Sequence, residues 1–224
     1  FESMKAYKPS SGYQMFRPRE IIRRMNDSAE RLCLPLLDED FTLKALETLI
    51  TLEYDWIPDL PGTSLYIRPF MFGSSAVIGV KPAEEYQFRI LVTPVGPYFK
   101  GGVKPIVVRI SDRDRAAPNG TGDIKAGLNY AMSLYNIMDA HRQGYAENMY
   151  LDPATHTYIE ETGGANIIFI TKDGKLVTPK SSSILPSITR RSLVHVAKEY
   201  LGLEVEERPV HKDELTTFEE CGLC

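Results

Sequence analysis

Lys125 is the residue of this chain whose type and surroundings could do covalent chemistry. It lies in the glycine-containing segment GTGDIKAGLNY at 120–130, and a lysine amine becomes a nucleophile once it has lost its proton. Glu161 opens a second glycine-containing segment, ETGGANIIF at 161–169. A carboxylate can keep a neighbouring protonated nitrogen in its charged state. Each residue alone is typical of a solvated loop or a strand end, so the case for a site depends on their joint occurrence.

The spacings Lys-x₄-Tyr and Glu-x-Gly-x₂-Asn, in this order, make the two segments resemble the active-site signature of the branched-chain aminotransferases. These are pyridoxal-phosphate enzymes of fold type IV. The resemblance implies that Lys125 bonds covalently to pyridoxal 5'-phosphate and that Glu161 accepts a hydrogen bond from its protonated pyridine nitrogen. It also implies that Tyr130 hydrogen-bonds the phenolic oxygen of the cofactor. The lysine amine would carry a proton between the substrate Cα and the cofactor.

The resemblance further implies where the cofactor phosphate binds. A helix is expected to open in the segment ILPSIT at 184–189, and the N–H groups at a helix start suit a phosphate. The family pattern assigns this contact to the backbone of Ile188 and Thr189. Arg24 matches the family arginine that reaches the phosphate from the first domain, since a guanidinium presents fork-shaped donors. Without the resemblance, an ordinary capped helix and a surface arginine would be the better interpretations.

Four positions are implied in substrate binding. Tyr66 and Arg68 are two apart in a predicted strand and therefore point to the same face, although a solvent-facing strand would show the same spacing. The resemblance makes Tyr66 a wall of the side-chain pocket and Arg68 a polar contact near the substrate carboxylate. Phe1 corresponds to an aromatic residue of that pocket. Gly164 stands where some members of the family have a threonine that touches the substrate.

Composition excludes several classes of protein. The 224 residues carry a net charge of -4 with no basic stripe, which argues against a nucleic-acid partner. No apolar run reaches the roughly 18 to 20 residues of a membrane span. The 3 cysteines fit a reducing compartment, and we expect a cytoplasmic protein. Cys221 and Cys224 form a Cys-x₂-Cys motif, but no histidine pair accompanies it, so we expect no metal site.

The chain is expected to form two domains of mixed helix and strand. Residues 1–112 are predicted as a smaller N-terminal α/β domain, RDRAAPNG at 113–120 as a linker, and 121–224 as a larger cofactor-binding domain. The fold class is therefore α+β. The resemblance adds the two-domain fold type IV arrangement, similar to the D-amino-acid aminotransferases, with the cofactor in the interdomain cleft. Compared with the family pattern, both ends of the chain look cut.

Hydrophobic periodicity and turn residues predict the individual elements. Helices are expected from Pro18, over 41–56, over 128–144 with Gly144 as a left-handed cap, and from the segment 184–189 onward. The first has an apolar face formed by Ile21, Ile22, Met25, Ala29, Leu32 and Cys33. The last has a buried stripe formed by Leu193, Val196, Ala197, Tyr200 and Leu201. Strands are expected at 64–70, 86–92 and 106–110 in the first domain, and at 149–151, 166–171 and 176–178 in the second.

The resemblance implies a branched-chain amino-acid transaminase. Such an enzyme moves the amino group of L-leucine, L-isoleucine or L-valine to 2-oxoglutarate through a lysine-bound pyridoxal phosphate, usually as a homodimer. Its partners would be small amino acids and 2-oxo acids. The alternatives are a D-amino-acid transaminase or aminodeoxychorismate lyase of the same fold, against which the segment Tyr66–Pro69 argues, and an inactive truncated scaffold.

Overall fold

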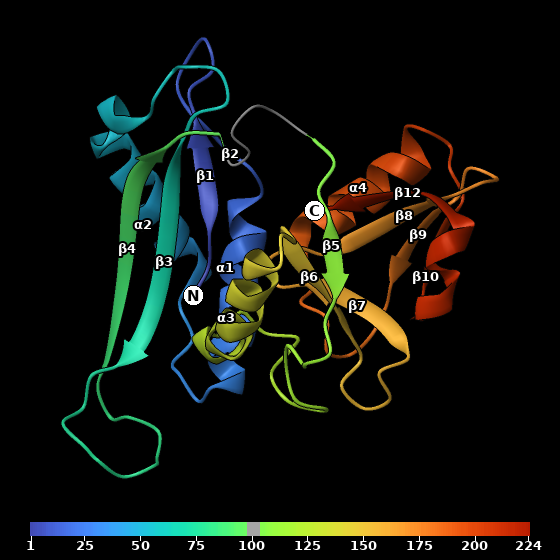
Figure 1. Cartoon of the computed structure of the whole chain (residues 1–224). Helices are drawn as coiled ribbons and strands as arrows, with labels where there is room; N and C mark the ends of the chain where they lie inside the picture. Colours follow the sequence, from blue (N-terminus) through green and yellow to red (C-terminus); the bar gives the residue numbers. More distant parts are fainter. Residues whose placement is uncertain (98–103) are drawn as a thin grey trace. The chain divides into compact units, whose positions relative to one another are not determined.

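The computed structural model describes residues 1–97 and 104–224, and the chain divides into two compact units, Phe1–Lys104 and Pro105–Cys224 (Figure 1). We call them unit 1 and unit 2. The helices are α1 Pro18–Arg31, α2 Glu39–Leu52, α3 Gly127–Arg142 and α4 Ile188–Glu199, with 3₁₀ turns η1 Tyr54–Trp56 and η2 Lys212–Thr217. The strands are β1 Met4–Tyr7, β2 Gln14–Met15, β3 Ser64–Gly73, β4 Tyr86–Val95, β5 Val108–Ile110, β6 Glu147–Leu151, β7 Tyr158–Thr162, β8 Ile167–Thr171, β9 Leu176–Pro179, β10 Val205–Arg208, β11 Val210–His211 and β12 Phe218–Leu223. The expected α+β class is confirmed.

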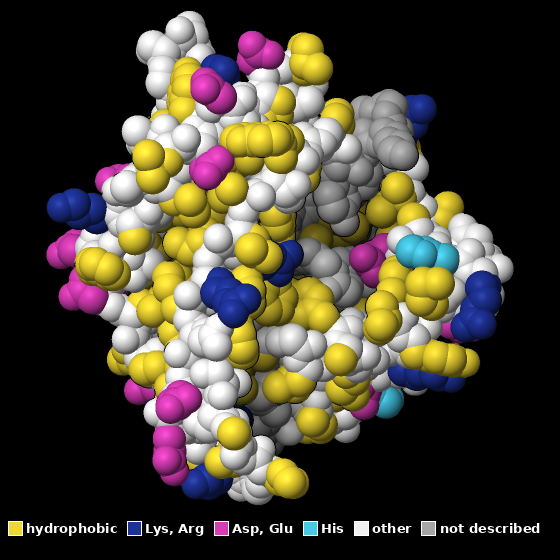
Figure 2. Space-filling view, turned by 90° about the vertical axis from the view of Figure 1, so that its left-hand side faces the viewer, with side chains coloured by type: hydrophobic (Ala, Val, Ile, Leu, Met, Phe, Trp, Pro, Cys, Tyr) yellow, Lys and Arg dark blue, Asp and Glu magenta, His cyan; other side chains and the backbone are white. Residues whose placement is uncertain are grey.

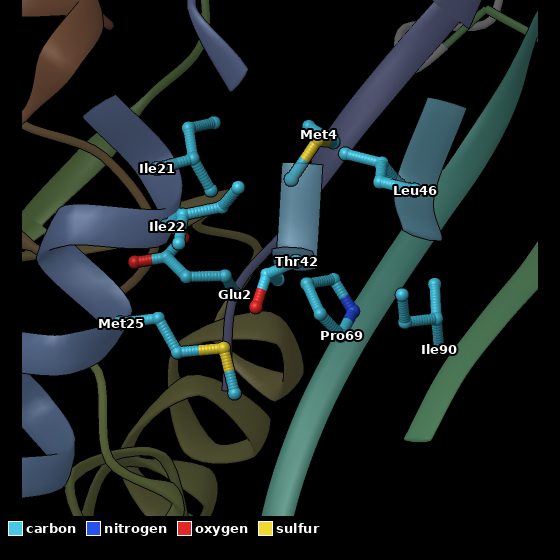
Figure 3. Close-up of a pocket in the computed structure, with 9 residues that line it drawn as sticks. All are labelled: Glu2, Met4, Ile21, Ile22, Met25, Thr42, Leu46, Pro69 and Ile90. Atoms are coloured by element: carbon cyan, nitrogen blue, oxygen red, sulfur yellow. The ribbon is translucent and has the colours of Figure 1, made fainter. Parts of the chain in front are cut away.

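Unit 1 is a four-stranded antiparallel sheet with two helices on one face. The strand order is β2-β1-β3-β4, and β3 and β4 pair over their whole lengths, from Ser64 opposite Val95 to Gly73 opposite Tyr86. Side chains of α1, α2, β1, β3 and β4 meet around a small hollow in the core (Figure 3). Its walls are apolar apart from Thr42 and Glu2, which enters from the start of β1. The sheet thus places Glu2 beneath α1.

α1 has the predicted buried face but ends earlier than the predicted one. Ile21, Ile22, Met25 and Ala29 are buried, whereas Leu32 and Cys33 are exposed. The backbone leaves the helix after Arg31, because Cys33 has a φ of 55° in the left-handed region. The expectation that these two residues continue the buried face was therefore wrong.

α2 begins at a side-chain cap. The Asp38 carboxylate accepts from the N–H of Phe41 at 2.7 Å, which satisfies one of the unpaired amides at the helix start. Thr42, Leu46 and Ile50, spaced four apart, form its buried face. The helix predicted over 41–56 thus begins at Glu39 and ends at Leu52, followed by the 3₁₀ turn η1.

Unit 2 packs two four-stranded sheets face to face. Their strand orders are β11-β7-β6-β5 and β10-β9-β8-β12. The core between them is formed by Met149, Leu151, Ile159, Ile167, Phe169, Val177 and Val210. Because strand residues alternate between faces, Leu176 points away from this core and packs with Val194 and Ala197 of α4 on the opposite side. α3 packs against β6.

The boundary between the units does not coincide with the predicted linker. The division falls after Lys104, so that residues 113–120 belong to unit 2. The strand predicted at 106–110 was grouped with the first domain, but β5 pairs in parallel with β6 of unit 2. The predicted domains 1–112 and 121–224 remain a prediction about the functional division of the chain.

The two helices of unit 2 differ in how well they agree with the predicted pattern. α3 ends as predicted, with Gly144 at a φ of 86° and its N–H donating to the carbonyl of His141. In α4, Ile188, Val194 and Ala197 are buried, while Val196, Tyr200 and Leu201 are exposed. The predicted stripe was right at Ala197 but wrong at Val196, Tyr200 and Leu201, because Val194 shares the face of Ala197 that packs on Leu176 of β9.

Large hydrophobic side chains remain exposed in both units. Examples are Phe72 on β3 and Leu91 on β4 in unit 1, and Leu134 and Met138 on α3 in unit 2. Figure 2 shows hydrophobic side chains gathered in the middle of one face. Among the described residues, no helix combines the length and the apolar character needed to cross a membrane.

Candidate active site

Lys125 lies in the loop that leads into α3, and Asn129 in the first turn of that helix holds this loop. The buried Asn129 amide donates to the carbonyls of Thr121 at 2.6 Å and Ile124 at 3.0 Å. It also accepts from the Thr121 hydroxyl at 2.8 Å. With both ends of the amide in use, the residues on either side of Lys125 have little freedom. The loop is therefore a fixed support for the lysine.

The amine of Lys125 contacts the phenol of Tyr130. Their Nζ and Oη atoms are 2.8 Å apart, and the amine also lies 5.3 Å from the centre of the Tyr130 ring. Tyr130 follows Asn129 on α3, so the same helix turn orients both the loop and the partner of the lysine. The structure brings these two predicted residues together.

Glu161 is buried in β7 with 4% of its surface exposed. Its Oε1 forms an ion pair with Nη2 of Arg115 at 2.8 Å and accepts from the N–H of Leu185 at 3.0 Å. Its Oε2 accepts from the Asn166 amide at 2.7 Å. Glu161 is therefore an ionisable group that is buried away from water and oriented by hydrogen-bond donors. Asn166 is the asparagine of the predicted Glu-x-Gly-x₂-Asn spacing.

Burial raises the pKa of Glu161 to about 7, against the charge of Arg115 and the Leu185 N–H, which lower it. The neighbouring charge of Glu160 raises the pKa further, and the charge of Lys125 lowers it. The charge of Lys125 therefore acts on the Glu161 carboxylate. A carboxyl that titrates near neutral pH can hold or release a proton at little cost.

Arg115 is a site residue that sequence analysis missed. It lies in the predicted linker, yet it is only 7% exposed. Besides Glu161, its Nη2 donates to the carbonyls of Gly122 at 3.0 Å and Ser183 at 2.5 Å. These carbonyls come from segments far apart in sequence, so no local pattern signals the contact. The glycines near Arg115 favoured a solvated linker instead.

Gly122 permits the close approach of two of these segments. A Cβ at this position would lie 2.3 Å from the Ser183 carbonyl oxygen and 2.9 Å from Nη2 of Arg115. Any other residue would have to push the two backbones apart. Gly122 is therefore required because Ser183 and Arg115 pack against it beside Glu161, and not because a turn needs a glycine there.

α4 begins next to the same segment. Ser187 caps the helix, its hydroxyl accepting from the N–H of Arg190 at 3.0 Å. The amides of Ile188 and Thr189 are the first of the helix and have no carbonyl partner within it. Two side-chain atoms of this region, Oδ1 of Asn166 and Nε of Arg190, are buried without a hydrogen-bond partner. Such atoms favour a region built to meet a polar ligand.

Gly164 follows Glu161 in the turn between β7 and β8. Its neighbour Gly163 leaves room for Glu147 of β6, because a Cβ on Gly163 would come within 3.1 Å of the Glu147 carboxylate. Burial raises the pKa of Glu147, and its hydrogen bonds with the backbone of Asn148 and Gly163 work in the opposite direction. This carboxylate therefore holds the turn that carries Gly164.

Arg24 lies in unit 1, on α1. Its Nε and Nη2 donate to the two oxygens of Glu2 at 2.7 and 2.8 Å, and the Glu2 side chain is completely buried. In Figure 3 the Glu2 side chain extends from the start of β1 toward α1. The sequence predicted a role for Arg24 but not for Glu2. The position of Glu2 next to Arg24 depends on the sheet, which brings Glu2 beneath α1.

The predicted substrate residues of unit 1 come together beside the first half of β3. Arg68 donates to the hydroxyl of Tyr66, and its guanidinium lies 4.6 Å from the centre of the Phe1 ring. Phe1 is placed by β1, which pairs with β3, and the Glu2 N–H donates to the carbonyl of Pro69 at 2.8 Å. All three side chains are half-buried.

The cysteines form no site in the described part of the chain. Cys33, Cys221 and Cys224 are free, and burial raises the pKa of the Cys221 and Cys224 thiols, which disfavours the reactive thiolate. Within residues 1–97 and 104–224, no group of three or more histidine, cysteine, aspartate or glutamate side chains could hold a metal ion.

Comparison with known proteins gives one family. The family model described as "Amino-transferase class IV" matches residues 1–224. The branched-chain-amino-acid aminotransferase of Helicobacter pylori strain J99 is 49% identical over 228 residues, covering 100% of this chain and 67% of the relative. The enzyme of the same name from Haemophilus influenzae is 47% identical over 231 residues, with the same coverage.

Solved structures agree with these relatives. The branched-chain amino acid aminotransferase of Escherichia coli superposes with a TM-score of 0.83 at 33% identity, covering 100% of this chain and 71% of that one. The branched-chain amino acid aminotransferase from Thermobaculum terrenum, in its PLP form, gives a TM-score of 0.81 at 26% identity, covering 100% and 71%. The relatives are longer, which fits the expectation that the sequence is a piece of such a protein.

Proposed function

This chain belongs to the class IV aminotransferases, among the branched-chain amino-acid enzymes, and we propose on that premise that it uses pyridoxal phosphate bound at Lys125. The amino group of L-leucine, L-isoleucine or L-valine would be transferred to 2-oxoglutarate. The observation that carries the proposal is the contact between Lys125 and Tyr130 in the same environment as the buried Glu161.

The residues of unit 2 fit the cofactor in chemical type. An amine with a phenol beside it suits the aldehyde and phenolic oxygen, and a buried carboxylate suits the pyridine nitrogen. The first amides of α4, at Ile188 and Thr189, suit a phosphate. When bound, the cofactor would supply a ring that accepts the electrons released at the substrate Cα.

The protein's own residues would hold and move protons around that ring. Lys125 would take the proton from the substrate Cα and deliver it to the cofactor, since its amine is the base held in the site. Tyr130 orients this amine through the 2.8 Å hydrogen bond. Glu161 holds the ring proton, and Arg115 prevents the carboxylate from turning away. Burial of Glu161 keeps water from this proton.

The residues of unit 1 would supply binding. Arg24 donates to the phosphate while Glu2 fixes its guanidinium. Phe1 and Tyr66 offer aromatic walls to an aliphatic side chain, and Arg68 between them offers donors to an acidic acceptor such as 2-oxoglutarate. Gly164 would leave backbone room beside the substrate. These assignments make unit 1 the part that selects the substrate.

Labelling of the lysine tests this proposal. The chain is mixed with pyridoxal phosphate, reduced with borohydride, and digested for mass spectrometry. We expect a visible absorbance band before reduction and the label on Lys125, absent in Lys125→Ala and retained in Lys172→Ala, which alters an exposed lysine. A label on other lysines, or none, would contradict the assignment.

Substrate preference is tested by a single half-reaction. L-leucine should remove the visible band within one turnover, and D-alanine should leave it unchanged. The reverse preference would favour a D-amino-acid transaminase, and no reaction with either would favour an inactive scaffold. We further propose that the enzyme acts in the cytoplasm as a homodimer, supported by exposed side chains such as Leu134 and Met138 on α3. Sedimentation would show twice the mass of the chain.

A further inference from the structure

Glu160, the residue before Glu161, is a second buried carboxylate that the proposed chemistry does not use. Only 3% of its surface is exposed. Successive residues of a strand point to opposite faces, so Glu160 does not share the face of Glu161 in β7. Within residues 1–97 and 104–224, no lysine, arginine or histidine forms an ion pair with it. A buried carboxylate without a cation is costly, which calls for a compensating role.

Two serines of the segment Ser181–Leu185 compensate for this cost. The hydroxyls of Ser181, at 2.6 Å, and of Ser183 both donate to Oε1 of Glu160. The N–H of Ser183 in turn donates to the Ser181 hydroxyl at 3.1 Å. One carboxylate oxygen therefore accepts hydrogen bonds from two side chains of a segment that has no regular secondary structure. Hydrogen bonds to a charged acceptor are the stronger kind.

The same segment supports Glu161 from the other side. The Ser183 carbonyl accepts from Nη2 of Arg115, the nitrogen that pairs with Glu161. The Leu185 N–H donates directly to Glu161 at 3.0 Å. Ser187, which caps α4 and so fixes the amides assigned to the phosphate, follows two residues later. Displacing the segment would disturb all three contacts together.

We propose that Glu160 is a positioning residue for the cofactor site, which acts through Ser181 and Ser183 to hold the segment 181–185 against Arg115 and Glu161. The effect on cofactor binding rests on the proposed function. The positioning of the segment rests on the hydrogen bonds of Glu160. Glu160 touches neither substrate nor cofactor. Its acceptor oxygen holds the segment, and its charge acts on the protonation of Glu161.

These two effects can be separated by substitution. Glu160→Gln keeps a carbonyl oxygen for the serine hydroxyls and removes the charge. Glu160→Ala removes both, and the double variant S181A/S183A removes the donors while keeping the charge. Glu207→Ala, on an exposed residue of β10, is the matched control. Should Glu160→Ala not fold, the glutamine and serine variants still provide the test.

Cofactor affinity is the first measurement, by absorbance titration with pyridoxal phosphate. Glu160→Ala and S181A/S183A should bind about 10-fold or more weakly, since each loses two charge-assisted hydrogen bonds. Glu160→Gln should bind within about 3-fold of the unaltered chain, and Glu207→Ala should bind equally well. Unchanged affinity in Glu160→Ala would overturn the inference, as would equal losses in Glu160→Gln and Glu160→Ala.

The second measurement is the pH dependence of unfolding without cofactor, which reports the proton on Glu161. The charged groups that act on Glu161 are Arg115, Glu160 and Lys125. Removing the charge of Glu160 should move the midpoint of this dependence to lower pH, and S181A/S183A should not lower it. An unmoved midpoint in Glu160→Gln would overturn the inference. If the unaltered chain binds no cofactor, the proposed function fails, but this measurement still decides the role of Glu160.

Discussion

Arg24 in unit 1 and Lys125 in unit 2 are both cations assigned to the cofactor, but the protein holds them by different means. Arg24 forms a two-pronged ion pair with the fully buried Glu2. The amine of Lys125 hydrogen-bonds to the phenol of Tyr130 at 2.8 Å. A single hydrogen bond is easily exchanged for another, whereas breaking a buried ion pair costs several kcal/mol. In the proposed function, this difference separates the cation that binds from the amine that reacts.

The buried carboxylates of the two units, Glu2 and Glu161, differ in the same way. Glu2 faces a single arginine and fixes it. Glu161 has an ion pair with Arg115 and accepts from Asn166 and the Leu185 N–H, and burial raises its pKa to about 7. Unit 1 therefore uses charge for position, and unit 2 keeps a charge that can be gained or lost near neutral pH.

Replacing the lysine should give the largest effect. Lys125→Ala is expected to lower the transamination rate by roughly 10⁴-fold or more, the scale on which loss of a reacting group acts. Its free energy of unfolding should change by less than about 1 kcal/mol, because the hydrogen bond to Tyr130 that it loses is exchangeable. Steady-state kinetics and urea unfolding of the same preparation provide the two values. A large loss of stability would mean that Lys125 is held as firmly as Arg24.

Glu2→Gln should show the opposite behaviour. The variant leaves the Arg24 charge without its counter-charge, which is expected to destabilise unit 1 by about 3 kcal/mol in urea unfolding. Glu39→Gln, which removes an exposed ion pair with Arg23 at 3.0 Å, is the control and should cost less than about 1 kcal/mol. Equal costs for the two variants would contradict the role given to the buried pair.

Glu161 should make the stability of the cofactor-free protein depend on pH. The group has its usual pKa of 4.5 when unfolded and about 7 when folded, so between these values the folded chain keeps a proton that the unfolded chain has lost. Its contribution to stability is complete below pH 4.5 and is lost as the pH rises to about 7, by an amount on the order of 3 kcal/mol. Glu161→Gln should remove this fall. Urea unfolding between pH 4.5 and 8 gives both curves, and a parallel fall in the variant would assign it to another group.

Tyr130→Phe should have the smallest effect of the four. It removes the partner of the Lys125 amine and keeps the ring, so the expected loss in rate is about 10-fold with no change in stability. Rates measured from pH 6 to 9 would show whether the loss is uniform. A loss as large as that of Lys125→Ala would give Tyr130 a direct part in proton transfer.

Sequence analysis predicted most elements and the named site residues because both leave local signals. Helix caps and apolar spacing gave α1 and α2, and the ordered motifs gave Lys125, Tyr130 and Glu161. Their functional roles remain predictions, although the structure places Lys125 beside Tyr130 and within electrostatic reach of Glu161.

The residues that were missed depend on distant contacts. Arg115 meets Ser183 across a long stretch of chain, and Glu2 meets Arg24 only after the sheet forms. β5 was assigned to the wrong unit because its parallel partner β6 comes after α3. In α4, both Val194 and Val196 fit a helical stripe, and only packing on β9 selects Val194. Local periodicity carries no information on these choices.

The amide of Asn129 has a consequence for the ageing of the protein. Its nitrogen faces two backbone carbonyls, so hydrolysis of the amide to a carboxylate would set an oxygen against both of them. The change replaces one side-chain nitrogen with an oxygen, and it would displace the loop that carries Lys125. Preparations stored for long periods would then contain folded molecules that have lost their activity.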